Sequence, residues 1–474
     1  MANPARGGAA GAEQVRWMEA RRSEASAESV VAPNTPPLSK GVARRAGGFL
    51  LLALLLAACS SGPEDGAPGG GPIRLTYWSS QNPQELDLAR SLVSEWNAAN
   101  PGVQVTLQAI PAGQSSEEVL LAAIVGKTTP DVCSNVWPGI LADFVRAKGV
   151  LRLDTLAGFD SLMAARIPAN LRDAFRSPDG GYYQVPWKTN PILMLYNRRL
   201  LREAGFTSPP RTYSEYLRAG AKVTRDRDGN GQIDQWMGYR DIRPVWWQRY
   251  FDYYPFYIGA SGGKTLFDAR GRVALDVRAS DQVFGFFQTV FERGYFPVTT
   301  FQNNPFLDER IATEFTGPWS AAYLAENAPA SLDYDYAPLP VPDDHAGPVY
   351  TYGDYKNIAI FSTTRHPEAA WRFVQFLVSP AADRRLVEVT RQIPLRQGIA
   401  TDAGLDSFYT ANPAIRRFAE AANVTRGVDA VPQLQEVLDA VAQGFERAVY
   451  RAETPAEATA STAKRIRLIT AWGR

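Results

Sequence analysis

The chain has 474 residues, with 50 Lys and Arg against 49 Asp and Glu, so its formal net charge is +1. A nearly neutral chain without a basic tract lacks the electrostatic footprint of a nucleic-acid-binding protein. Because the chain contains only two Cys and two His, a disulfide framework or a His/Cys metal centre is not expected. A chain of this length exceeds what one hydrophobic core usually supports, which favours two globular units.

The N-terminal segment has the form of an export signal. Three basic residues, Lys40, Arg44 and Arg45, precede an apolar run over residues 49–56, and this run is shorter than the ~20 residues that span a bilayer. The letters LAAC, which end at Cys59, resemble the lipobox of bacterial lipoproteins. That resemblance implies cleavage before Cys59 and a lipid on its sulfur. An uncleaved anchor or a secreted soluble form is the alternative, and a start codon downstream of Met1 stays open.

The next segments predict the start of an α/β sheet. Residues 1–58 are expected to be an extension and signal peptide, and residues 59–72, rich in Gly and Pro, a flexible tether. Then come the strand IRLTYW, a helix that ends at NPG, the strand VQVTLQAI, the helix SSEEVLLAAIVGK and the strand PDVCSNV. Alternating strands and helices predict a parallel sheet, whose ligand side lies at the carboxyl ends of its strands. Trp78, Asn135 and Trp137 occupy those ends.

An acidic loop follows the helix that begins at the capping box TYSE and ends at Val223. The loop reads DRDGNGQID over residues 226–234, with the ligand spacing of an EF-hand-type calcium loop. Its last ligand position is Met237, which offers no hard oxygen, and no amphipathic helix pair flanks it. A sensor is therefore not predicted. A structural calcium ion or a plain Asx-type turn stays open. The candidate ligands are Asp226, Asp228, Asn230, Gln232 and Asp234.

Four segments then share an order with one family: PDV, YYQVPW with MLYNRRLLREAGFTSPPRTYSEY, TGPW, and HPEAAWRFVQFLVSPAADRRLVEVTRQIPLR. From about Ile73 to the C-terminus, their order and spacing resemble the extracellular solute-binding proteins of ABC importers. The resemblance is to the carbohydrate-binding group, which includes maltose-binding protein.

This resemblance implies an α/β, two-lobed periplasmic-binding-protein-like fold with crossing hinge strands. By analogy, the chain crosses between lobes near residues 186–191, 350–357 and 393–396. Lobe one then holds residues 73–188 and 353–392, and lobe two holds residues 189–352 and 393–474.

A sugar presents apolar C–H faces and a rim of hydroxyls, so its site needs stacking rings and polar side chains at their edges. The chain has 11 Trp, more than a core of this size needs. Core packing is the alternative for each Trp. The aromatic candidates are Trp78, Trp137, Trp187, Trp246, Trp247 and Trp319. The polar candidates, near strand ends or crossings, are Asn135, Asp354, Tyr355 and Arg396.

Together these observations predict a monomeric, lipid-anchored substrate-binding protein on the extracytoplasmic face of the membrane. It would deliver a sugar or oligosaccharide to an ABC permease and would require no cofactor. The same transport role for a glycerol phosphodiester or a polyamine is the alternative. A secreted carbohydrate-active enzyme is less favoured, although acidic pairs such as Asp343 with Asp344 exist. The sequence has no P-loop, zinc-binding His pair or dinucleotide fingerprint.

Overall fold

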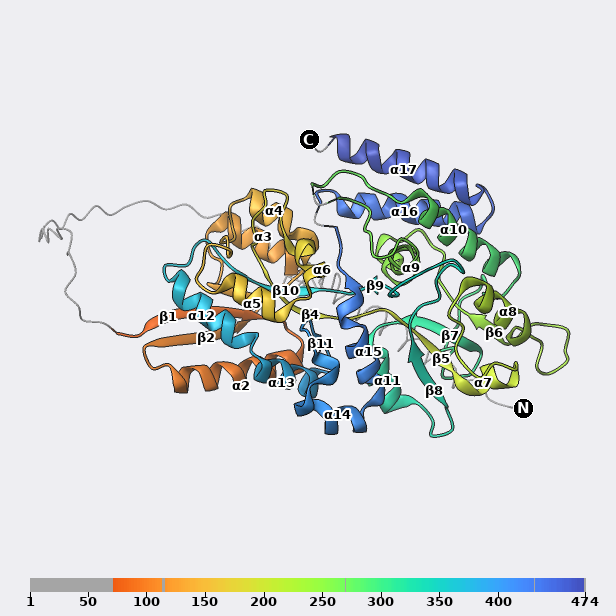
Figure 1. Ribbon diagram of the computed structural model, residues 1–474, viewed down its shortest axis with the longest axis horizontal. Coiled ribbons are helices and arrows are strands. Elements are labelled where there is room, and N and C mark those ends of the chain that lie inside the picture. The colour runs from red at the N-terminus through yellow and green to blue at the C-terminus, as the bar shows by residue number, and fades with distance from the viewer. Residues whose placement is uncertain (1–70, 113–115, 269, 430, 473–474) are drawn as a thin grey trace, which may run out of the picture.

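The computed structural model describes residues 71–112, 116–268, 270–429 and 431–472. Cys59, the predicted signal peptide and the predicted tether up to residue 70 lie outside the described residues. Two α/β lobes lie side by side and are joined by extended segments near the middle of the molecule (Figure 1).

Lobe one is built on a six-stranded sheet with the strand order β11-β4-β10-β3-β1-β2. Strand β1 runs parallel to β2 and β3, whereas β10 runs antiparallel to both β3 and β4. Its strands are β1 (Ile73–Ser79), β2 (Val103–Ala109), β3 (Val132–Val136), β4 (Val185–Thr189), β10 (Lys356–Ile360) and β11 (Ile393–Pro394). Its helices are α2 (Pro83–Ala99), α3 (Ser116–Gly126), α4 (Leu141–Arg146), α5 (Phe159–Arg166), α6 (Ala169–Arg172), α12 (Pro367–Leu377) and α13 (Pro380–Thr390).

Helix α2 shows how the sequence fixes these elements. Asn82 caps the helix by accepting a hydrogen bond from the Glu85 amide at 3.1 Å, and Pro83 occupies the first turn, where its missing N–H costs nothing. Residues at helical spacing then face the lobe-one core, and Trp96 is among them. Glu85, in the first turn, is also buried. A charged residue at this position would be expected to be exposed to solvent.

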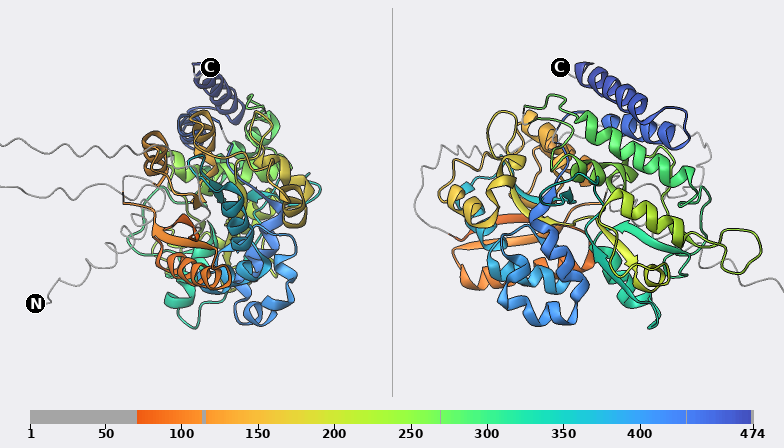
Figure 2. Two further views of the ribbon diagram at one scale, coloured as in Figure 1. Left: turned by 90° about the vertical axis from the view of Figure 1, so that its left-hand side faces the viewer. Right: turned by 45° about the vertical axis from the view of Figure 1, so that its right-hand side comes forward.

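Lobe two contains a four-stranded sheet with the order β6-β7-β5-β8 and a two-stranded pair, β9 with β12. Its strands are β5 (Leu193–Asn197), β6 (Trp236–Gly238), β7 (Ile311–Thr316), β8 (Tyr334–Ala337), β9 (Thr351–Tyr352) and β12 (Thr425–Arg426). Its helices are α7 (Arg198–Glu203), α8 (Tyr213–Val223), α9 (Tyr253–Ala260), α10 (Val277–Glu292), α11 (Pro318–Asn327), α14 (Asp406–Ala411), α15 (Pro413–Ala421), α16 (Leu434–Val449) and α17 (Pro455–Trp472). Helices α10, α16 and α17 pack together on the outer side of lobe two (Figures 1 and 2).

The chain passes between the lobes at three places. The first crossing joins β4, which ends at Thr189, to β5, and the second joins β9 to β10, which begins at Lys356. The backbone amide of Asp354 donates to the carbonyl of Asn190 at 3.2 Å, so these two crossings lie side by side. The third follows β11, whose residues pair with Thr189 and Lys188 of β4. The third crossing therefore follows Pro394, within the expected range of residues 393–396, and β11 belongs to the lobe-one sheet although residues 393–394 were expected in lobe two.

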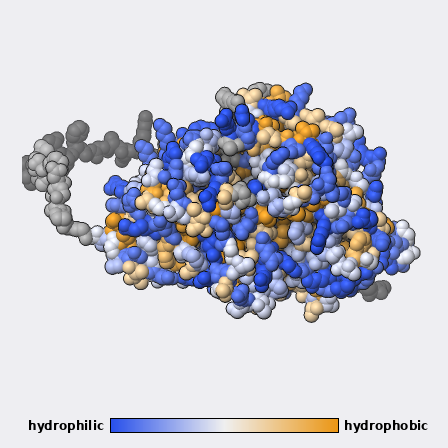
Figure 3. Space-filling model, in the orientation of Figure 1, coloured by the Kyte–Doolittle hydropathy of each residue, from blue (hydrophilic) through white to orange (hydrophobic). Residues whose placement is uncertain are grey.

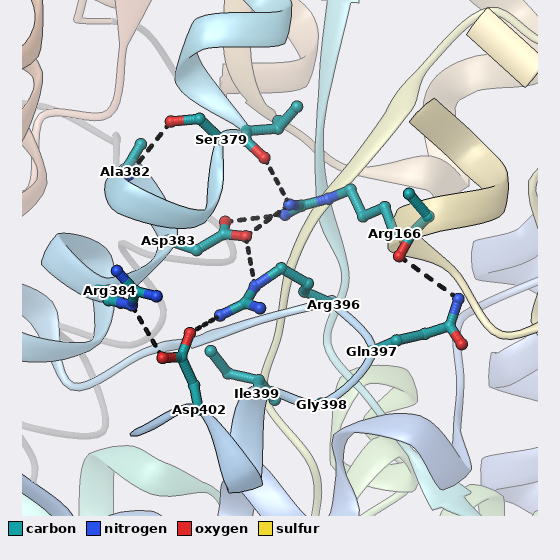
Figure 4. A network of polar contacts seen from close by, with 12 residues as sticks. Arg166, Ser379, Ala382, Asp383, Arg384, Arg396, Gln397, Gly398, Ile399 and Asp402 are labelled. Carbon is teal, nitrogen blue, oxygen red and sulfur yellow. Dashed lines mark hydrogen bonds and ion pairs between the residues drawn. The ribbon is translucent and has the colours of Figure 1, made fainter. Parts of the chain in front are cut away.

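A ladder of charges, fully buried at Arg166 and Asp383 and more exposed toward Arg384, fastens the third crossing to lobe one (Figure 4). The Arg166 guanidinium, 2% exposed, contacts both carboxylate oxygens of Asp383 at 2.7 and 3.0 Å. Asp383 also pairs with Arg396 at 3.0 Å. Arg396 reaches Asp402 at 2.5 Å, and Asp402 pairs with Arg384 at 2.9 Å. Alternating signs leave each charge in the ladder with a partner, which is what allows Asp383 to be fully buried.

The surface of the described residues is mostly polar. On the face in Figure 3, hydrophilic residues cover most of both lobes, and apolar residues form only small patches. Among the described helices, none combines the length and the apolar composition that a membrane span requires.

Candidate functional site

The first wall of the candidate site is the edge of the lobe-one sheet that faces lobe two. Strands β1 and β3 are parallel, and β10 is antiparallel to both β3 and β4, so β1, β3 and β4 all run in the same direction. Their carboxyl ends therefore meet at one edge, from which β4 leads into the first crossing. In α/β sheets this is the edge at which ligands bind.

Glu85 lies buried at this edge and accepts hydrogen bonds from three segments. Gln392 donates its amide to Glu85 at 2.6 Å and Asn135 donates at 2.5 Å, while the Lys188 ammonium pairs with the same carboxylate. Burial acts to raise the pKa of Glu85, but the charge of Lys188 and the three hydrogen bonds outweigh it, so the net effect lowers that pKa. Glu85 is therefore held ionised.

Trp137 carries the lobe-one wall toward lobe two. It follows β3 directly and packs, partly exposed, against the hydrophobic core of lobe two. Burial raises the pKa of the Tyr352 hydroxyl well above its usual value, and a hydrogen bond with Trp137 partly opposes this shift. The Tyr352 ring stacks on Tyr250, with centroids 4.7 Å apart. A hydrogen bond from Trp137 to Tyr352 and the stack of Tyr352 on Tyr250 thus link lobe one, through the second crossing, to lobe two.

The second wall is a group of aromatic rings in lobe two. Trp246 lies 6.2 Å from Tyr250, edge to face, and Trp247 lies 6.4 Å from Phe251. Phe251 in turn meets Trp319, the second residue of α11, at 5.8 Å. All three Trp side chains are half-buried, so each keeps part of its ring open to a ligand.

Two glycines allow Trp137 and Trp319 their positions. A Cβ at Gly139 would collide with the Trp137 ring, and a Cβ at Gly317 would collide with the Trp319 ring. Each indole therefore folds back over a glycine two residues away, in the segments WPG and GPW. Only glycine permits so close an approach.

A polar group lies at the base between the walls. Asp354, in the second crossing, has a side chain 29% exposed and 3.7 Å from the Lys356 ammonium. It also accepts a hydrogen bond from the Tyr352 hydroxyl at 3.3 Å. Because carboxylates accept hydrogen bonds from hydroxyl groups, Asp354 suits the polar rim of a sugar.

A pocket of about 540 Å³ is lined by residues of both lobes. Lobe one lines it with α4 and residues 177–179, and lobe two lines it with residues 270–272 and 431–432. The pocket has the size of a small-molecule site. Its lining contains no aromatic side chain and none of the predicted site residues, so it is separate from the aromatic site.

Six of the predicted site residues lie on the elements described above: Asn135 and Trp137 at the lobe-one edge, Asp354 in the second crossing, and Trp246, Trp247 and Trp319 in the lobe-two ring group. The side chain of Asn135 is turned toward Glu85.

Four other predicted residues are occupied by structural contacts. Trp78 is buried beside α3, where its indole N–H donates to Gln108 at 3.0 Å. Trp187 lies in the lobe-one core. We leave both out of the proposed site.

Tyr355 and Arg396 are held in the same way. The Tyr355 ring stacks on Phe175 at 5.2 Å, and its hydroxyl pairs with Thr425. Arg396 belongs to the ion ladder of the third crossing. Both sit near a crossing as expected, but packing and hydrogen bonding bury the Tyr355 side chain and ion pairing occupies Arg396, so we leave them out as well.

The sequence did not single out Glu85, Lys188, Tyr250 or Tyr352. A Glu in the first turn of a helix is usually a solvated residue that favours the helix dipole. Its buried partners lie 103 and 307 residues away, so no local pattern announced them. The aromatic density of residues 246–257 was the one signal that could have indicated Tyr250.

The acidic loop is closed by hydrogen bonds of its own. The two Asp226 oxygens accept from the amides of Gly229 and Gly231 at 2.7 and 2.6 Å, and Asp234 accepts from the Arg227 amide at 2.9 Å. Met237 is fully buried in β6. Among the described residues, no group of at least three His, Cys, Asp or Glu side chains is arranged to hold a metal ion.

Residues 259–263 spell GASGG, which matches the letters of the G-x-S-x-G nucleophile pattern. The pattern requires a strand-to-helix elbow, whereas Ser261 caps the C-terminal end of α9 and its hydroxyl donates to the carbonyl of Lys264 at 3.0 Å. The local structure is therefore a helix end and not a nucleophile elbow.

Comparison with known proteins gives consistent results. Residues 82–384 match the family model described as bacterial extracellular solute-binding protein. A maltotriose-binding protein of Pyrococcus abyssi is 26% identical over 359 residues, which cover 74% of this chain and 72% of that protein. An uncharacterized lipoprotein of Streptomyces antibioticus is 30% identical over 183 residues, 37% of this chain and 38% of that protein.

Solved structures share the fold. An uncharacterized protein of Listeria monocytogenes has a TM-score of 0.78 at 23% identity, covering 84% of this chain and all of that one. The cyclic alpha-maltosyl-1,6-maltose binding protein of Arthrobacter globiformis has a TM-score of 0.72 at 18% identity, covering 84% of this chain and 99% of that one. The predicted two-lobed α/β fold is confirmed.

Proposed function

Because the chain belongs to the bacterial extracellular solute-binding protein family, we propose that it is the substrate-binding component of an ABC importer for a sugar or oligosaccharide. It would hold the solute between its two lobes and deliver it to a membrane permease. The chain is a binding protein and not an enzyme, in keeping with its family and with its maltotriose-binding relative.

The observation that carries this proposal is the set of half-buried indoles between the lobes. Trp137 comes from lobe one, and Trp246, Trp247 and Trp319 come from lobe two. Indole faces suit the C–H faces of sugar rings, and Asp354 supplies a hydrogen-bond acceptor beside them. The relative that binds maltotriose supports a carbohydrate over a phosphodiester or a polyamine.

Capture would proceed by closure of the lobes about their crossings. A solute that contacts rings of both lobes has more contacts in the closed form than in the open form. It therefore shifts the population toward closure by that difference in binding free energy. The permease would recognise the closed form.

Intrinsic Trp fluorescence, titrated with a panel of mono- and oligosaccharides, tests this function. Because the proposed site contains four half-buried indoles, a bound sugar should change the emission in a saturable way. A response to a glycerol phosphodiester or a polyamine, with none to any sugar, would reassign the solute. Release of a chemically altered sugar would contradict the binding role.

We also propose that the chain is a monomer anchored by a lipid on Cys59. The lipobox-like LAAC segment and the relative that is named a lipoprotein support the anchor. A Cys59→Ala variant, expressed in a bacterial host, should lose incorporation of labelled fatty acid and leave the membrane fraction. A variant that keeps both would disprove the anchor.

A further inference from the structure

Glu85 is a buried acid to which the proposed function gives no direct role. Its side chain is 6% exposed, and both carboxylate oxygens are occupied. Oε1 accepts from Lys188 and Gln392, and Oε2 accepts from Asn135. A carboxylate with these partners is not free to contact a solute, so any role of Glu85 in binding must come from the segments that its hydrogen bonds hold in place.

The donors to Glu85 come from three segments that lead into different parts of the site. Lys188 is the penultimate residue of β4, just before the first crossing. Gln392 directly precedes β11, which leads into the third crossing. Asn135 lies two residues before Trp137. One carboxylate therefore ties both crossing segments and the aromatic wall of lobe one together.

The hydrogen bond between Asn135 and Glu85 stabilises an unfavourable backbone conformation. Its backbone is left-handed, with φ of 64°, a conformation that is unfavourable for residues other than glycine although Asn tolerates it best. The hydrogen bond from its side chain to Glu85 fixes the turn. This turn sets the direction in which the chain leaves β3, and so the place of Trp137 against Tyr352.

Lys188 makes the arrangement sensitive to charge. Its side chain is 2% exposed, and its ammonium lies 4.7 Å from the centre of the Trp187 ring. If Glu85 were neutral, this buried ammonium would lose the carboxylate that it contacts, which is far more costly than removing both charges together. The chain could respond only by losing the proton from Lys188 or by moving the end of β4.

We propose that Glu85 is a positioning residue for solute binding, whose buried carboxylate fixes the first crossing and the Asn135–Trp137 turn in the arrangement that places Trp137 opposite lobe two. This proposal rests on the function proposed above only where solute affinity is the readout.

The affinity test compares three variants at constant temperature. In Glu85→Gln, affinity for the best-bound sugar should fall at least tenfold at pH 7. Burial lowers the pKa of Lys188, which Lys356 and Asp354 also face, so affinity should recover partly as the pH is raised and Lys188 loses its proton, while the wild type stays constant. Glu85→Gln combined with Lys188→Met should return to within about threefold of wild type, because neither buried charge is then left unpaired. Glu95→Gln, on the exposed side of the same helix in a surface pair with Arg385, should bind like wild type.

Two results would overturn the proposal. Wild-type affinity in a folded Glu85→Gln variant would show that the carboxylate positions nothing. A double variant as weak as Glu85→Gln would show that the charged groups themselves contact the solute.

A second measurement needs no ligand, so it stays informative if the wild type binds no sugar. With 5-fluorotryptophan incorporated, the fluorine resonance of Trp137 is assigned by its loss in Trp137→Phe. In Glu85→Gln it should shift, while that of Trp371, buried on α12, stays in place. The double variant, Glu85→Gln with Lys188→Met, should return the Trp137 resonance to its wild-type position. Its spectrum is informative even if Glu85→Gln alone does not fold. An unmoved Trp137 resonance in folded Glu85→Gln would refute the role.

Discussion

In lobe one, the sheet edge that leads into the first crossing is held by the buried pair of Glu85 and Lys188, whereas the proposed site in lobe two is made of the half-buried rings of Trp246, Trp247 and Trp319. Ion pairs buried with good geometry fix direction, because their partners cannot be exchanged without a large cost. Rings bind through area and tolerate several orientations of a sugar. Under the proposed function, lobe one would provide a preset polar frame, and lobe two would provide an adaptable stacking surface.

Buried carboxylates of the two lobes can have different partners, although lobe two also holds a fully buried ion pair of Arg249 with Asp252. Glu85 faces a cation, which keeps its pKa low despite burial. Asp429, near the lobe-two rings, instead accepts hydrogen bonds from the amides of Leu266 and Phe267 and from the Tyr254 hydroxyl. Burial raises the pKa of Asp429 to about 6, and these hydrogen bonds only partly oppose the shift. Opposite responses to pH should follow.

The largest loss of stability should come from breaking the ion ladder that fastens the third crossing to lobe one. Asp383→Asn leaves the Arg166 guanidinium, 2% exposed, without its anion, and the loss of one partner from a buried ion pair costs about 3–5 kcal/mol. Denaturant unfolding should report a loss of stability in this range.

Its matched control is Asp333→Asn, which removes a surface pair with Arg198 and Arg202 in lobe two. Exposed pairs contribute at most about 1 kcal/mol. Equal losses in the two variants would contradict the view that lobe one depends on buried charge.

Removing a lobe-two ring should weaken binding more than folding. Trp319→Ala takes away a half-buried indole at the start of α11, and binding of the best sugar should weaken by about 2 kcal/mol, the scale of an aromatic hot spot. Fluorescence titration or calorimetry measures this change.

Trp236→Ala is the control for this variant. Trp236 is also half-buried, but it packs against Phe301 in a different hydrophobic cluster, so its loss should lower stability and leave affinity unchanged. A loss of affinity equal to that of Trp319→Ala would mean that both act only through the stability of lobe two.

The pH response of Asp429 should be smaller. Because its folded pKa of about 6 lies above its usual 3.8, the folded state takes up a proton more readily than the unfolded chain. From pH 7 down to pH 5 this group should therefore raise the free energy of unfolding by about 1 kcal/mol. Glu85, with a lowered pKa, contributes stability at neutral pH that is lost in acid.

The measurement is the difference in unfolding free energy between wild type and Asp429→Asn at the two pH values. The variant should lack the rise. An identical pH dependence in both proteins would show that Asp429 does not titrate in this range.

The smallest effect concerns the acidic loop, which lies outside both walls. The sequence leaves open a structural calcium ion at Asp226, Asp228, Asn230, Gln232 and Asp234. If calcium is bound, a chelator should lower the Tm by a few degrees, equivalent to about 1 kcal/mol, and Asp228→Asn should remove that response. Sugar affinity should be unchanged in both cases. An unchanged Tm would show that no calcium stabilises the loop. The alternative is then a turn stabilised by the hydrogen bonds of Asp226 and Asp234.

Much of the molecule could be predicted from the sequence, because it depends on local and ordered patterns. Alternating strands and helices predicted the α/β lobes, and the order of the PDV, TGPW and HPEAAW segments predicted the family. The glycine beside each of Trp137 and Trp319 is likewise readable in the letters WPG and GPW.

Only the tertiary structure decided which side chains face the cleft. Successive side chains along a strand point to opposite faces, so a place near a strand end does not tell whether Trp78 or Trp187 meets a ligand or the core. Glu85 and its partners on β4 and before β11 meet only after the sheet has assembled. The sequence by itself therefore determined the architecture and the kind of ligand surface, while long-range packing determined the charges that hold it.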